Sequence, residues 1–576
     1  MTTVITRYQI NQLLYDGTRT LVYRGFKTED SKPVVLKKLR KEYPTFNELL
    51  QFRHQYVLSK NLEGPGIVKP IALEKSGNGY VLVMEDVGGV SLSEYVGDRP
   101  QDIGEFLQVA IAITKILEDL YRNRVIHKDI KPANILINPE TKEIYLIDFS
   151  ISSLLPRETQ EIQNPNILEG TLAYISPEQT GRMNRGIDYR SDFYSLGVTF
   201  YQLLTGELPY HTDDPMELVH CHIAKTPIPP HKVKPDLPQA LSEIVMKLMA
   251  KTAEQRYQSA RGIKQDLEKC WLQWQKTGRI AKFELGERDI SDRFIMPEKL
   301  YGREAEVQTL LSAFDRAAKG QAETMLVAGF SGIGKTAVVN EVHKPIVRQR
   351  GYFIKGKFDQ FQRNIPFSAF VIAFRDLMGQ LLSESDARME MWKTAILNAL
   401  GENSQVIIEV IPELERIIGK QPLAVELSGS AATNRFNLLF GKFIRVFTTP
   451  EHPLVIFIDD LQWADSASLK LMQLLMEDSQ SGYLLLLGAY RDNEVFPAHP
   501  LMLSLDEIAK LGATVNTITL APLNRGALNR LVADTLCCSL ELGLPLTKLV
   551  YQKTKGNPFF ATQFLKSLHE DGWIKF

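Results

Sequence analysis

Residues 127–134 bring together the side chains that phosphoryl transfer to a hydroxyl group needs. They read His-Lys-Asp-Ile-Lys-Pro-Ala-Asn, and Asp148 follows 14 residues after Asn134, at the end of a short apolar run. This chemistry depends on an aimed nucleophile and a neutralised phosphate charge rather than on covalent catalysis by the protein. Asp129 can accept the proton of the attacking hydroxyl, and Lys131 can lie near the transferred phosphate. Asn134 and Asp148 offer the oxygen ligands that Mg²⁺ prefers.

A glycine-rich segment in the second half of the chain has the spacing of a phosphate-binding loop. Residues 329–336 read Gly-Phe-Ser-Gly-Ile-Gly-Lys-Thr, after a strand-like apolar run and before a helix-like one. In that context backbone N–H groups can wrap phosphates at a helix N-terminus. Lys335 would contact the β- and γ-phosphates, and the Thr336 hydroxyl would reach Mg²⁺. The nucleotide-binding residues expected here are Gly329, Ser331, Gly332, Gly334, Lys335 and Thr336.

A pair of acidic residues follows another apolar run and completes the second expected site. Residues 454–458 read Leu-Val-Ile-Phe-Ile, and Asp459 and Asp460 come next. Asp459 would hold Mg²⁺, and Asp460 would position the water that attacks the γ-phosphate. The alternative is that these carboxylates cap the next helix, a common use of aspartate. The phosphate-binding loop earlier in the chain favours the metal site.

The composition is that of a soluble protein with large cores and no strong overall field. Hydrophobic residues make up 44% and charged residues 23% of the 576 residues, and the formal net charge is −1. This balance gives no electrostatic reason to expect nucleic acid or an anionic membrane as a partner. The start does not resemble a signal peptide, and no apolar run reaches the roughly 18 residues of a membrane span. Four cysteines without a CxxC spacing predict neither a zinc site nor a disulfide framework, so a reducing, cytoplasmic compartment is expected.

The order of the expected elements divides the chain into two folded parts. Short strand-like runs such as residues 33–37 come first, and helical patterns follow from about residue 101. Strands before helices predict a small sheet lobe joined to a larger helical lobe. Residues 269–297 show no clear period and are interpreted as a connector. One apolar helix face is expected to consist of Phe106, Ala110, Ile113, Leu117 and Leu120.

Beyond the connector, strands and helices are expected to alternate. Residues 325–328, 454–458 and 483–487 are near-continuous apolar runs. Such runs are typical of parallel strands that are covered on both faces. The second half is therefore predicted to be a three-layer α/β domain.

The first half resembles the protein kinase signature over about residues 8–268. Val35-Leu36-Lys37 is similar to the lysine motif of the third strand, which implies that Lys37 binds the α- and β-phosphates. Met84-Glu85-Asp86-Val87 resembles the hinge, where backbone groups of Glu85 and Val87 would hold adenine. The resemblance implies an α+β bilobed protein kinase fold. Three further matches, structural in the family, are Ser176-Pro177-Glu178, Asp192 and Arg256.

The substrate class follows from two smaller features of the same resemblance. Lys131-Pro132 is more similar to Ser/Thr kinases than to tyrosine kinases, and Gly170-Thr171 agrees with this. Thr171 resembles the residue that holds the catalytic loop. Candidate autophosphorylation sites in the activation segment, each also interpretable as a turn residue, are Ser150, Ser152, Ser153, Thr159 and Thr171.

The sequence departs from the kinase pattern where the nucleotide is held. The glycine-rich loop falls at residues 15–22, ends on Val22 and keeps only its middle glycine, Gly17. The helix glutamate that pairs with Lys37 in the family falls near Gln55, which adds no charge. Lys128 and Ser150 replace the usual Arg and Gly of the two central motifs.

An acidic residue on the same helix offers an alternative partner for Lys37. Glu48 lies seven residues before Gln55, on roughly the same helix face. The sequence therefore leaves open which of the two side chains meets the lysine. None of these departures removes the expected base or a metal ligand.

The second half resembles the STAND signal-transduction ATPases, of the AAA-like type, over about residues 298–576. This resemblance implies that Pro558 lies near adenine and that Arg491 reads the γ-phosphate, although Arg491 is also interpretable as a surface arginine. It further implies an α/β three-layer P-loop NTPase fold and nucleotide-dependent self-association. The motifs that carry it are Tyr301-Gly302-Arg303-Glu304, Asp459 to Asp465 and Gly556-Asn557-Pro558-Phe559-Phe560.

A kinase followed directly by this ATPase resembles the bacterial, notably cyanobacterial, multi-domain signalling kinases. In those chains a histidine kinase follows farther on, so the resemblance implies either the N-terminal portion of a serine/threonine kinase–ATPase–histidine kinase protein or a truncated relative of one. The ATPase domain is expected to be incomplete at its C-terminus. The predicted parts are a kinase domain at 8–268, a linker at 269–297 and an ATPase domain at 298–576.

The sequence thus predicts a protein serine/threonine kinase that uses ATP and Mg²⁺, coupled to a P-loop ATPase switch. Its expected partners are protein substrates with Ser or Thr, without nucleic acid and without a membrane span. One alternative is a pseudokinase scaffold whose only nucleotide-dependent activity is the switch. A second alternative is a small-molecule phosphotransferase, which Ser176-Pro177-Glu178 and Thr171 disfavour.

Overall fold

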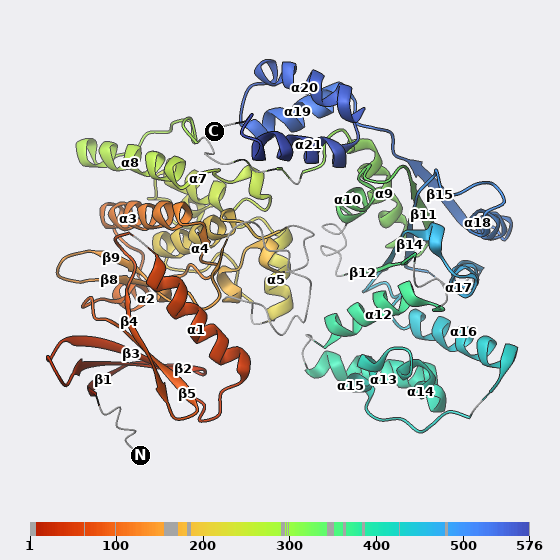
Figure 1. Cartoon of the computed structure of the whole chain (residues 1–576), viewed down its shortest axis with the longest axis horizontal. Helices are drawn as coiled ribbons and strands as arrows, with labels where there is room; N and C mark the ends of the chain where they lie inside the picture. Colours follow the sequence, from red (N-terminus) through yellow and green to blue (C-terminus); the bar gives the residue numbers. More distant parts are fainter. Residues whose placement is uncertain are drawn as a thin grey trace. The chain divides into compact units, whose positions relative to one another are not determined.

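In the computed structural model the chain divides into two compact units, one up to residue 289 and one from residue 294 onward (Figure 1). Each unit has its own sheet and its own helices. The structure describes residues 7–574 except 63, 98, 155–170, 181–185, 213, 290–293, 295, 298, 343–350, 361–364, 383–385, 426 and 478–481.

The first unit begins with a five-stranded antiparallel sheet in the order β1-β2-β3-β5-β4. One face of this sheet is buried, because Val34 and Leu36 of β3 pack with Val81 and Val83 of β5 and with Tyr8. The strands are β1 (Tyr8–Asp16), β2 (Thr20–Lys27), β3 (Pro33–Leu39), β4 (Pro70–Ser76) and β5 (Gly79–Glu85).

Helix α1 (Phe46–Asn61) packs beside this sheet and begins at a complete capping box. The Thr45 hydroxyl accepts from the backbone N–H of Glu48, and the Glu48 carboxylate accepts from the N–H of Thr45 at 2.7 Å. Two N–H groups that lack helical partners are satisfied in this way. The same helix carries Gln55 inward.

The rest of the first unit is mainly helical. The predicted apolar face at residues 106–120 is confirmed, because all five of its side chains are buried in α3. The helices are α2 (Leu92–Val96), α3 (Ile103–Arg122), α4 (Arg190–Thr205), α5 (Pro215–Ala224), α6 (Pro230–Val233), α7 (Gln239–Leu248) and α8 (Ala260–Thr277). Short strands between them are β6 (Val90–Ser91), β7 (Val125–Ile126), β8 (Ile135–Ile137), β9 (Ile144–Leu146) and β10 (Ser153–Leu154).

The structure differs from the sequence interpretation at residues 269–289, which are not a free connector. Helix α8 continues to Thr277, because the spacing of its buried residues Ile263, Leu267 and Cys270 extends the helical period beyond residue 268. The following segment folds back, and Asp289 accepts hydrogen bonds from the backbone N–H groups of Gln258 and Ser259 at 2.8 and 2.9 Å. This segment is therefore bound to the first unit.

The second unit is built on a five-stranded parallel sheet in the order β12-β13-β14-β11-β15. The three apolar runs predicted as parallel strands are confirmed as β11, β13 and β14. The edge strand β15 carries a mostly polar sequence, which explains why no apolar run indicated it. The strands are β11 (Ala322–Ala328), β12 (Tyr352–Lys357), β13 (Leu454–Asp459), β14 (Leu484–Tyr490) and β15 (Thr514–Thr519).

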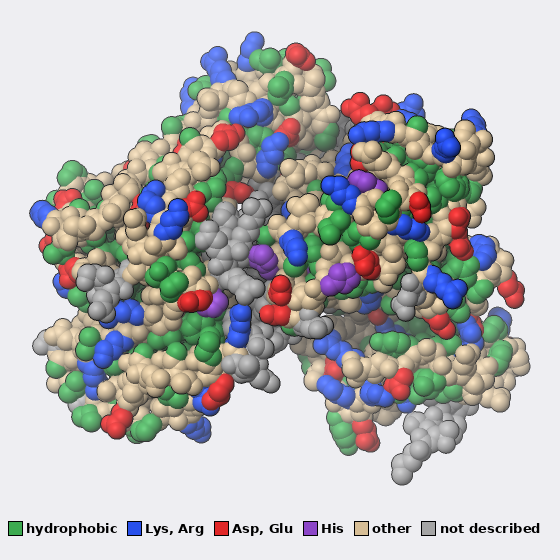
Figure 2. All heavy atoms as spheres, turned by 180° about the vertical axis from the view of Figure 1, so that it is seen from behind, with side chains coloured by type: hydrophobic (Ala, Val, Ile, Leu, Met, Phe, Trp, Pro, Cys, Tyr) green, Lys and Arg blue, Asp and Glu red, His purple; other side chains and the backbone are tan. Residues whose placement is uncertain are grey.

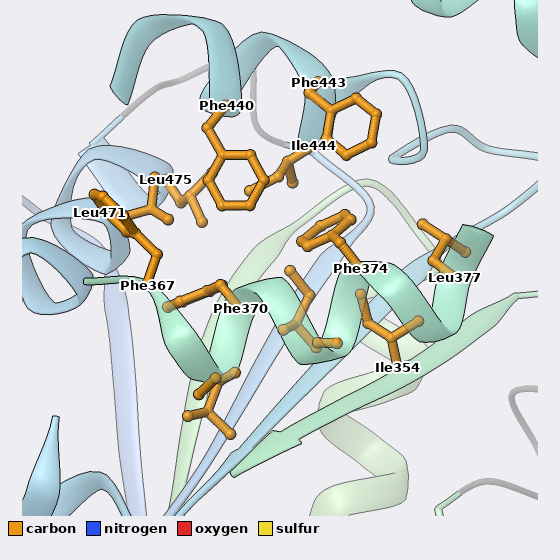
Figure 3. Close-up of a cluster of buried hydrophobic side chains, with 14 of the residues drawn as sticks. Ile354, Phe367, Phe370, Phe374, Leu377, Phe440, Phe443, Ile444, Leu471 and Leu475 are labelled. Carbon is orange, nitrogen blue, oxygen red and sulfur yellow. The ribbon is translucent and has the colours of Figure 1, made fainter. Parts of the chain in front are cut away.

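Helices cover both faces of this sheet. On one face α12 (Ser368–Leu381), α16 (Gly429–Arg445) and α17 (Ser466–Glu477) bury a cluster of aromatic and aliphatic side chains (Figure 3). Alternate residues of β13 face the two sides, with Ile456 in this cluster and Val455 in a second one. The second cluster lies under α9 (Glu304–Ala317) and α10 (Lys335–Asn340).

A helical bundle near the end of the chain has a core of its own. Leu528, Val532, Val550 and Leu565 are buried together there with Tyr301. Its helices are α19 (Arg525–Leu536), α20 (Leu540–Thr554) and α21 (Pro558–Glu570). The remaining helices of this unit are α13 (Asp386–Leu400), α14 (Ser404–Ile408), α15 (Glu415–Ile418) and α18 (Pro500–Lys510).

The described surface is mixed in charge. On the face drawn in Figure 2, lysine and arginine side chains are interspersed with aspartate and glutamate side chains. Among the residues that the structure describes, no helix has both the length and the apolar character needed to cross a membrane.

Candidate nucleotide and phosphoryl-transfer sites

A buried aspartate fixes the loop that carries the expected base. Asp192, at the first turn of α4, accepts hydrogen bonds from the backbone N–H groups of His127 and Lys128 at 2.8 and 2.7 Å. Burial raises the pKa of Asp192 above its ordinary value, although His127 and the two N–H donors oppose this. Lys128 has a φ of 70°, a conformation that costs free energy and persists here because these bonds hold it. The following residue, Asp129, is thereby set in one orientation.

Asp129 lies at the centre of a polar cluster. Its carboxylate accepts from Lys131 Nζ at 2.7 Å, from Asn134 Nδ2 at 2.8 Å and from the Thr171 hydroxyl at 3.1 Å. Lys131 also donates to the Thr171 hydroxyl. The structure thus brings together three predicted site residues, and Thr171 joins the activation segment to the catalytic loop.

Lys37 joins the sheet to α1 and to the metal-site aspartate. Its Nζ lies 2.9 Å from Asp148 Oδ1 and 3.1 Å from Gln55 Oε1. Burial alone would raise the pKa of Asp148, but the ammonium group of Lys37 outweighs it and lowers the pKa to about 2. Asp148 is therefore ionised at neutral pH, as a metal ligand must be.

The alternative partner, Glu48, does not reach the lysine. Its carboxylate is engaged at the N-terminus of α1, by the capping box and by Lys41 Nζ at 3.2 Å. The capping role was readable in the sequence, because Thr45 and Glu48 have the spacing of a capping box. Gln55 is thus the side chain of α1 that holds Lys37.

The expected adenine and phosphate segments lie at the ends of the antiparallel strands. Val22 of β2 is the cross-strand partner of Lys37, and Gly17 lies in the β1–β2 turn, where its N–H donates to Thr20 O at 3.0 Å. In the hinge, Glu85 N–H donates to Lys69 O at 3.0 Å. The carbonyl of Val87 accepts from Asn138 Nδ2 at 2.9 Å. The opposite backbone groups, Glu85 C=O and Val87 N–H, are those that an adenine would use.

An ion pair that the sequence interpretation missed anchors the hinge. Arg24 of β2 contacts Asp86 with Nε–Oδ2 at 2.7 Å and Nη2–Oδ1 at 3.3 Å. A fork of this kind fixes orientation as well as distance. Arg24 and Asp86 are 62 residues apart in the sequence, so no local spacing could reveal the pair.

The end of the activation segment is tied to the helical lobe. Arg256 forms a buried two-pronged pair with Glu178, at 2.6 and 2.9 Å, as the family resemblance implied. Burial would raise the pKa of Glu178, but the Arg256 guanidinium overcomes this and lowers it. Thr159 and Gly170, which the sequence singled out, lie outside the described residues.

The phosphate-binding loop of the second unit has the conformation that its glycines allow. Gly332 and Gly334 have φ values of 74° and 99°, a region that favours glycine. Gly334 is the N-cap of α10, and Lys335 is the first residue of that helix. Lys335 Nζ donates to the carbonyls of Gly329 and Phe330 at 2.8 and 3.1 Å. Burial lowers the pKa of Lys335, while Asp459 and Asp460 raise it.

The predicted metal-site pair of this unit is in contact. The Thr336 hydroxyl donates to Asp459 Oδ2 at 3.0 Å, which brings the end of β13 next to the loop. Burial and the neighbouring carboxylate of Asp460 raise the pKa of Asp459, and the bond from Thr336 opposes them. A divalent cation at this carboxylate would compensate the repulsion.

Two cations hold Asp460. Lys357 Nζ, at the end of β12, lies 3.1 Å from Asp460 Oδ2, and Arg491 Nε lies 3.5 Å from Oδ1. Arg491 also pairs with Glu494 at 2.8 Å and lies over the Trp463 ring. These contacts bring Arg491 next to the acidic pair at the end of β13. The interpretation from sequence missed Lys357, because β12 carries no motif.

The last predicted site residue, Pro558, is the first residue of α21. Its neighbours contact the phosphate-binding loop, since Asn557 Nδ2 donates to Ser331 O at 3.0 Å and Phe559 N–H donates to Gly332 O at 3.2 Å. Pro558 therefore lies beside the loop that would bind the nucleotide.

The first unit thus holds Lys37 against Asp148 and Asn134 against Asp129, and the second holds the loop at 329–336 against Asp459. Residues 8–272 match the family described as the protein kinase domain, and residues 299–487 match the AAA ATPase domain. The chain therefore contains a protein kinase domain followed by an AAA ATPase domain.

Individual relatives agree with this division. The chain is 31% identical to the hybrid signal transduction histidine kinase G of Dictyostelium discoideum, over 82% of this chain and 18% of that protein. It is 32% identical to the serine/threonine-protein kinase PrkC of Bacillus subtilis, over 46% of this chain and 40% of the relative. A probable serine/threonine-protein kinase of Clostridium perfringens is 31% identical over 46% of this chain and 38% of its own length. Two of these relatives are named as serine/threonine-protein kinases, and the chain spans less than half the length of each of the three.

Proposed function

We propose that the first unit transfers the γ-phosphate of ATP to serine or threonine hydroxyls of protein substrates. The observation that carries this proposal is the contact of Lys37 Nζ with Asp148 Oδ1 at 2.9 Å. It joins the strand that would bind the phosphates to the carboxylate that would bind the metal. Residues separated by 111 positions meet in this pair, and Asp129 is fixed nearby in the same unit.

The polar cluster supports one role for each residue. Asp129 would accept the proton of the substrate hydroxyl, because its orientation is set by Lys131, Asn134 and Thr171. Lys131, already bonded to Asp129, would neutralise charge on the transferred phosphate. Such positioning is the main source of catalysis in phosphoryl transfer.

The donor set fits Mg²⁺ bound together with ATP. Asn134 uses Nδ2 to hold Asp129, so its amide oxygen is the atom available to a metal. Asp148 is ionised at neutral pH, since its pKa is lowered to about 2. Bound Mg²⁺ supplies charge neutralisation at the phosphates.

We infer that the second unit is a STAND-type nucleotide switch. The motifs at 301–304, 459–465 and 556–560 support this, as do the contacts of Asp460 with Lys357 and Arg491. Lys335 and Thr336 would hold phosphates and Mg²⁺ with Asp459, and Asp460 would position the attacking water. Arg491 would exchange its contacts with Asp460 and Glu494 for the γ-phosphate. We also propose that the protein self-associates in a nucleotide-dependent way and is cytoplasmic. We further propose that it belongs to a longer chain that contains a histidine kinase.

The test is transfer of label from radioactive ATP by the intact chain, by Asp129→Ala and by Lys335→Ala. We expect label to enter the chain or a basic protein substrate, and to disappear only in Asp129→Ala. Hydrolysis that disappears only in Lys335→Ala would be assigned to the second unit. Label that persists in Asp129→Ala would contradict the proposed base.

One observation favours a second candidate, a pseudokinase scaffold. Lys37 meets the neutral Gln55 at 3.1 Å, and the nucleotide loop retains only Gly17 of its glycines. In that case the intact chain would bind ATP at the first unit without transferring label. The scaffold would then be the function of this unit, and only the second unit would hydrolyse ATP.

A further inference from the structure

The start of α21 is fastened to the phosphate-binding loop by two hydrogen bonds. Asn557 Nδ2 donates to the carbonyl of Ser331 at 3.0 Å, and Phe559 N–H donates to the carbonyl of Gly332 at 3.2 Å. These residues flank Pro558, so the helical bundle of α19–α21 meets the loop through three consecutive residues. The pairs are 226 and 227 positions apart, which makes the contact a property of the fold.

Asn557 performs two tasks with different atoms. Its Oδ1 accepts from the N–H groups of Phe559 and Phe560 at 3.1 and 3.3 Å, which caps α21. Its Nδ2 is then free to donate to Ser331. The first task is common to many N-cap residues, whereas the second needs the length and the donor of an amide side chain.

Glycines on both sides allow the close approach. A Cβ on Gly332 would lie 2.8 Å from the Cβ of Phe559, and a Cβ on Gly556 would lie 2.2 Å from the carbonyl oxygen of Leu523. Gly556 also has a φ of 81°. The carbonyl of Gly556 accepts from Leu523 N–H at 2.8 Å, which ties the start of α21 to the strand-to-helix connection before α19.

The hydrophobic cores explain why this polar contact matters. The bundle buries its own cluster of apolar residues, separate from the two clusters that cover the sheet. Among the residues that the structure describes, the hydrogen bonds from α21 to the loop are those of Asn557 and Phe559, whereas Arg303, which donates from Nη2 to Ile333 O at 3.3 Å, precedes α9 and lies outside the bundle. Such a boundary can open without disrupting a shared core.

We propose that Asn557 is a positioning residue that couples occupancy of the phosphate-binding loop to docking of the α19–α21 bundle. The proposal rests on nucleotide binding by this loop. The carbonyl of Ser331 and the N–H of Gly332 belong to one planar peptide group. A bond that orients the carbonyl therefore orients an N–H in the segment that would wrap the phosphates. Nucleotide binding and bundle docking each favour the same orientation, so each strengthens the other.

The test compares Asn557→Ser with Asn524→Ser in the full chain. Serine keeps the helix cap but is too short and lacks the amide donor for the bond to Ser331. Asn524 caps α19 by accepting from Ala527 N–H at 2.8 Å, so its replacement controls for the same change elsewhere in the bundle. The measured quantity is the dissociation rate of fluorescent ADP, restricted to the signal that Lys335→Ala removes.

We expect dissociation to be about 2- to 10-fold faster in Asn557→Ser and unchanged in Asn524→Ser, the effect of one net hydrogen bond. Hydrogen exchange in the first turn of α21 should slow on adding ADP in the wild type and in Asn524→Ser, but not in Asn557→Ser. If Asn557→Ser releases ADP at the wild-type rate and shows the wild-type slowing of hydrogen exchange in α21, the proposed coupling is wrong. If Lys335→Ala removes no signal, the nucleotide site itself is wrong, so the two failures are distinguishable.

Discussion

At the scale of single residues, the contact between Lys37 and Gln55 decides how the first unit holds its phosphate-binding lysine. Gln55 is only 3% exposed, so the amide cannot be replaced by water without rearrangement. An unpaired buried donor costs more free energy than the bond itself contributes. Because the amide of Gln55 is neutral, Asp148 is the described carboxylate that neutralises the charge of Lys37.

We predict that Gln55→Leu lowers the kcat/KM of substrate phosphorylation by roughly 10- to 100-fold, because one bond to a charged group contributes about 1.5–3 kcal/mol. Gln55→Glu should keep or raise activity, since it supplies the carboxylate that the kinase pattern contains. Steady-state kinetics with both variants makes the comparison. Equal loss in the two variants would show that the amide has a role that charge cannot fulfil.

The pKa of Asp148 gives a pH prediction. Its value is lowered from 3.8 to about 2, so the stabilisation from its ionised form is present above the ordinary value and is lost as the pH falls toward 2. Lys37→Met removes the largest contribution that opposes burial and leaves only the hydrogen bond from Ser150 and the effect of His127, so the pKa of Asp148 should rise. Mg²⁺-dependent ATP binding measured from about pH 4 to about pH 7 should show its acid limb at higher pH in this variant. Gln55→Leu keeps Lys37, so its ATP binding should decrease at the same acidic pH as that of the wild type.

At the scale of elements, α12 shows how one helix supports the second unit. Phe374 packs between α12 and α16, with ring centroids 5.4 Å from Phe440 and 5.5 Å from Phe443 (Figure 3). Ile372 lies on the same helix and is 50% exposed. Alanine substitutions at the buried Phe374 and at the exposed Ile372 therefore distinguish the contribution of burial to stability from that of helix propensity.

Phe374→Ala should therefore lower the free energy of unfolding of the second unit by about 3–5 kcal/mol, through lost burial and a residual cavity. Ile372→Ala should change it by less than about 1 kcal/mol, because an exposed side chain leaves no cavity. Urea denaturation followed by circular dichroism measures both. Similar losses for both variants would mean that the face of α12 that carries Ile372 is buried in solution.

Sequence reasoning succeeded where a function needs a contiguous motif or an apolar run. The loop at 329–336, the acidic pair at the end of β13 and the apolar face of α3 are local patterns; in the structure the loop leads into α10, Asp459 ends β13 and the apolar face is buried. Contacts between distant segments were not readable, as Arg24–Asp86 and Lys357–Asp460 show. The choice between Gln55 and Glu48 also needed the fold, because both lie on one helix and only packing decides which reaches Lys37.

The predicted boundary at residue 268 falls inside α8, which ends at Thr277, because the contacts beyond this boundary also join distant residues. Residues after 268 lack a strong period, but Cys270 continues the buried face of α8, and Asp289 bonds back to Ser259. Polar and backbone contacts of this kind leave no hydropathy signal. Several predicted site residues contact one another within each unit, and their chemical roles remain proposals for the assays above.

At the scale of the whole molecule, the two proposed nucleotide sites belong to units with separate hydrophobic clusters. The cluster of β3 and β5 belongs to the first unit, and the clusters on the two faces of the parallel sheet belong to the second. Units that share no core unfold as separate cooperative transitions. A ligand raises the transition of the unit that binds it, by about 2.7 kcal/mol at 100 times its Kd.

Calorimetry of the intact chain should therefore show two transitions, both shifted upward by Mg²⁺ and ADP. Lys335→Ala should abolish the shift of one transition, and Asp148→Asn should abolish the shift of the other. Each variant acts on one site only, so each should leave the remaining shift at its wild-type size. If either variant reduces both shifts, the two sites share a coupling free energy, because a ligand at one site can stabilise the other unit only through such coupling. The size of the shared loss would then measure the coupling free energy between nucleotide binding in the two units.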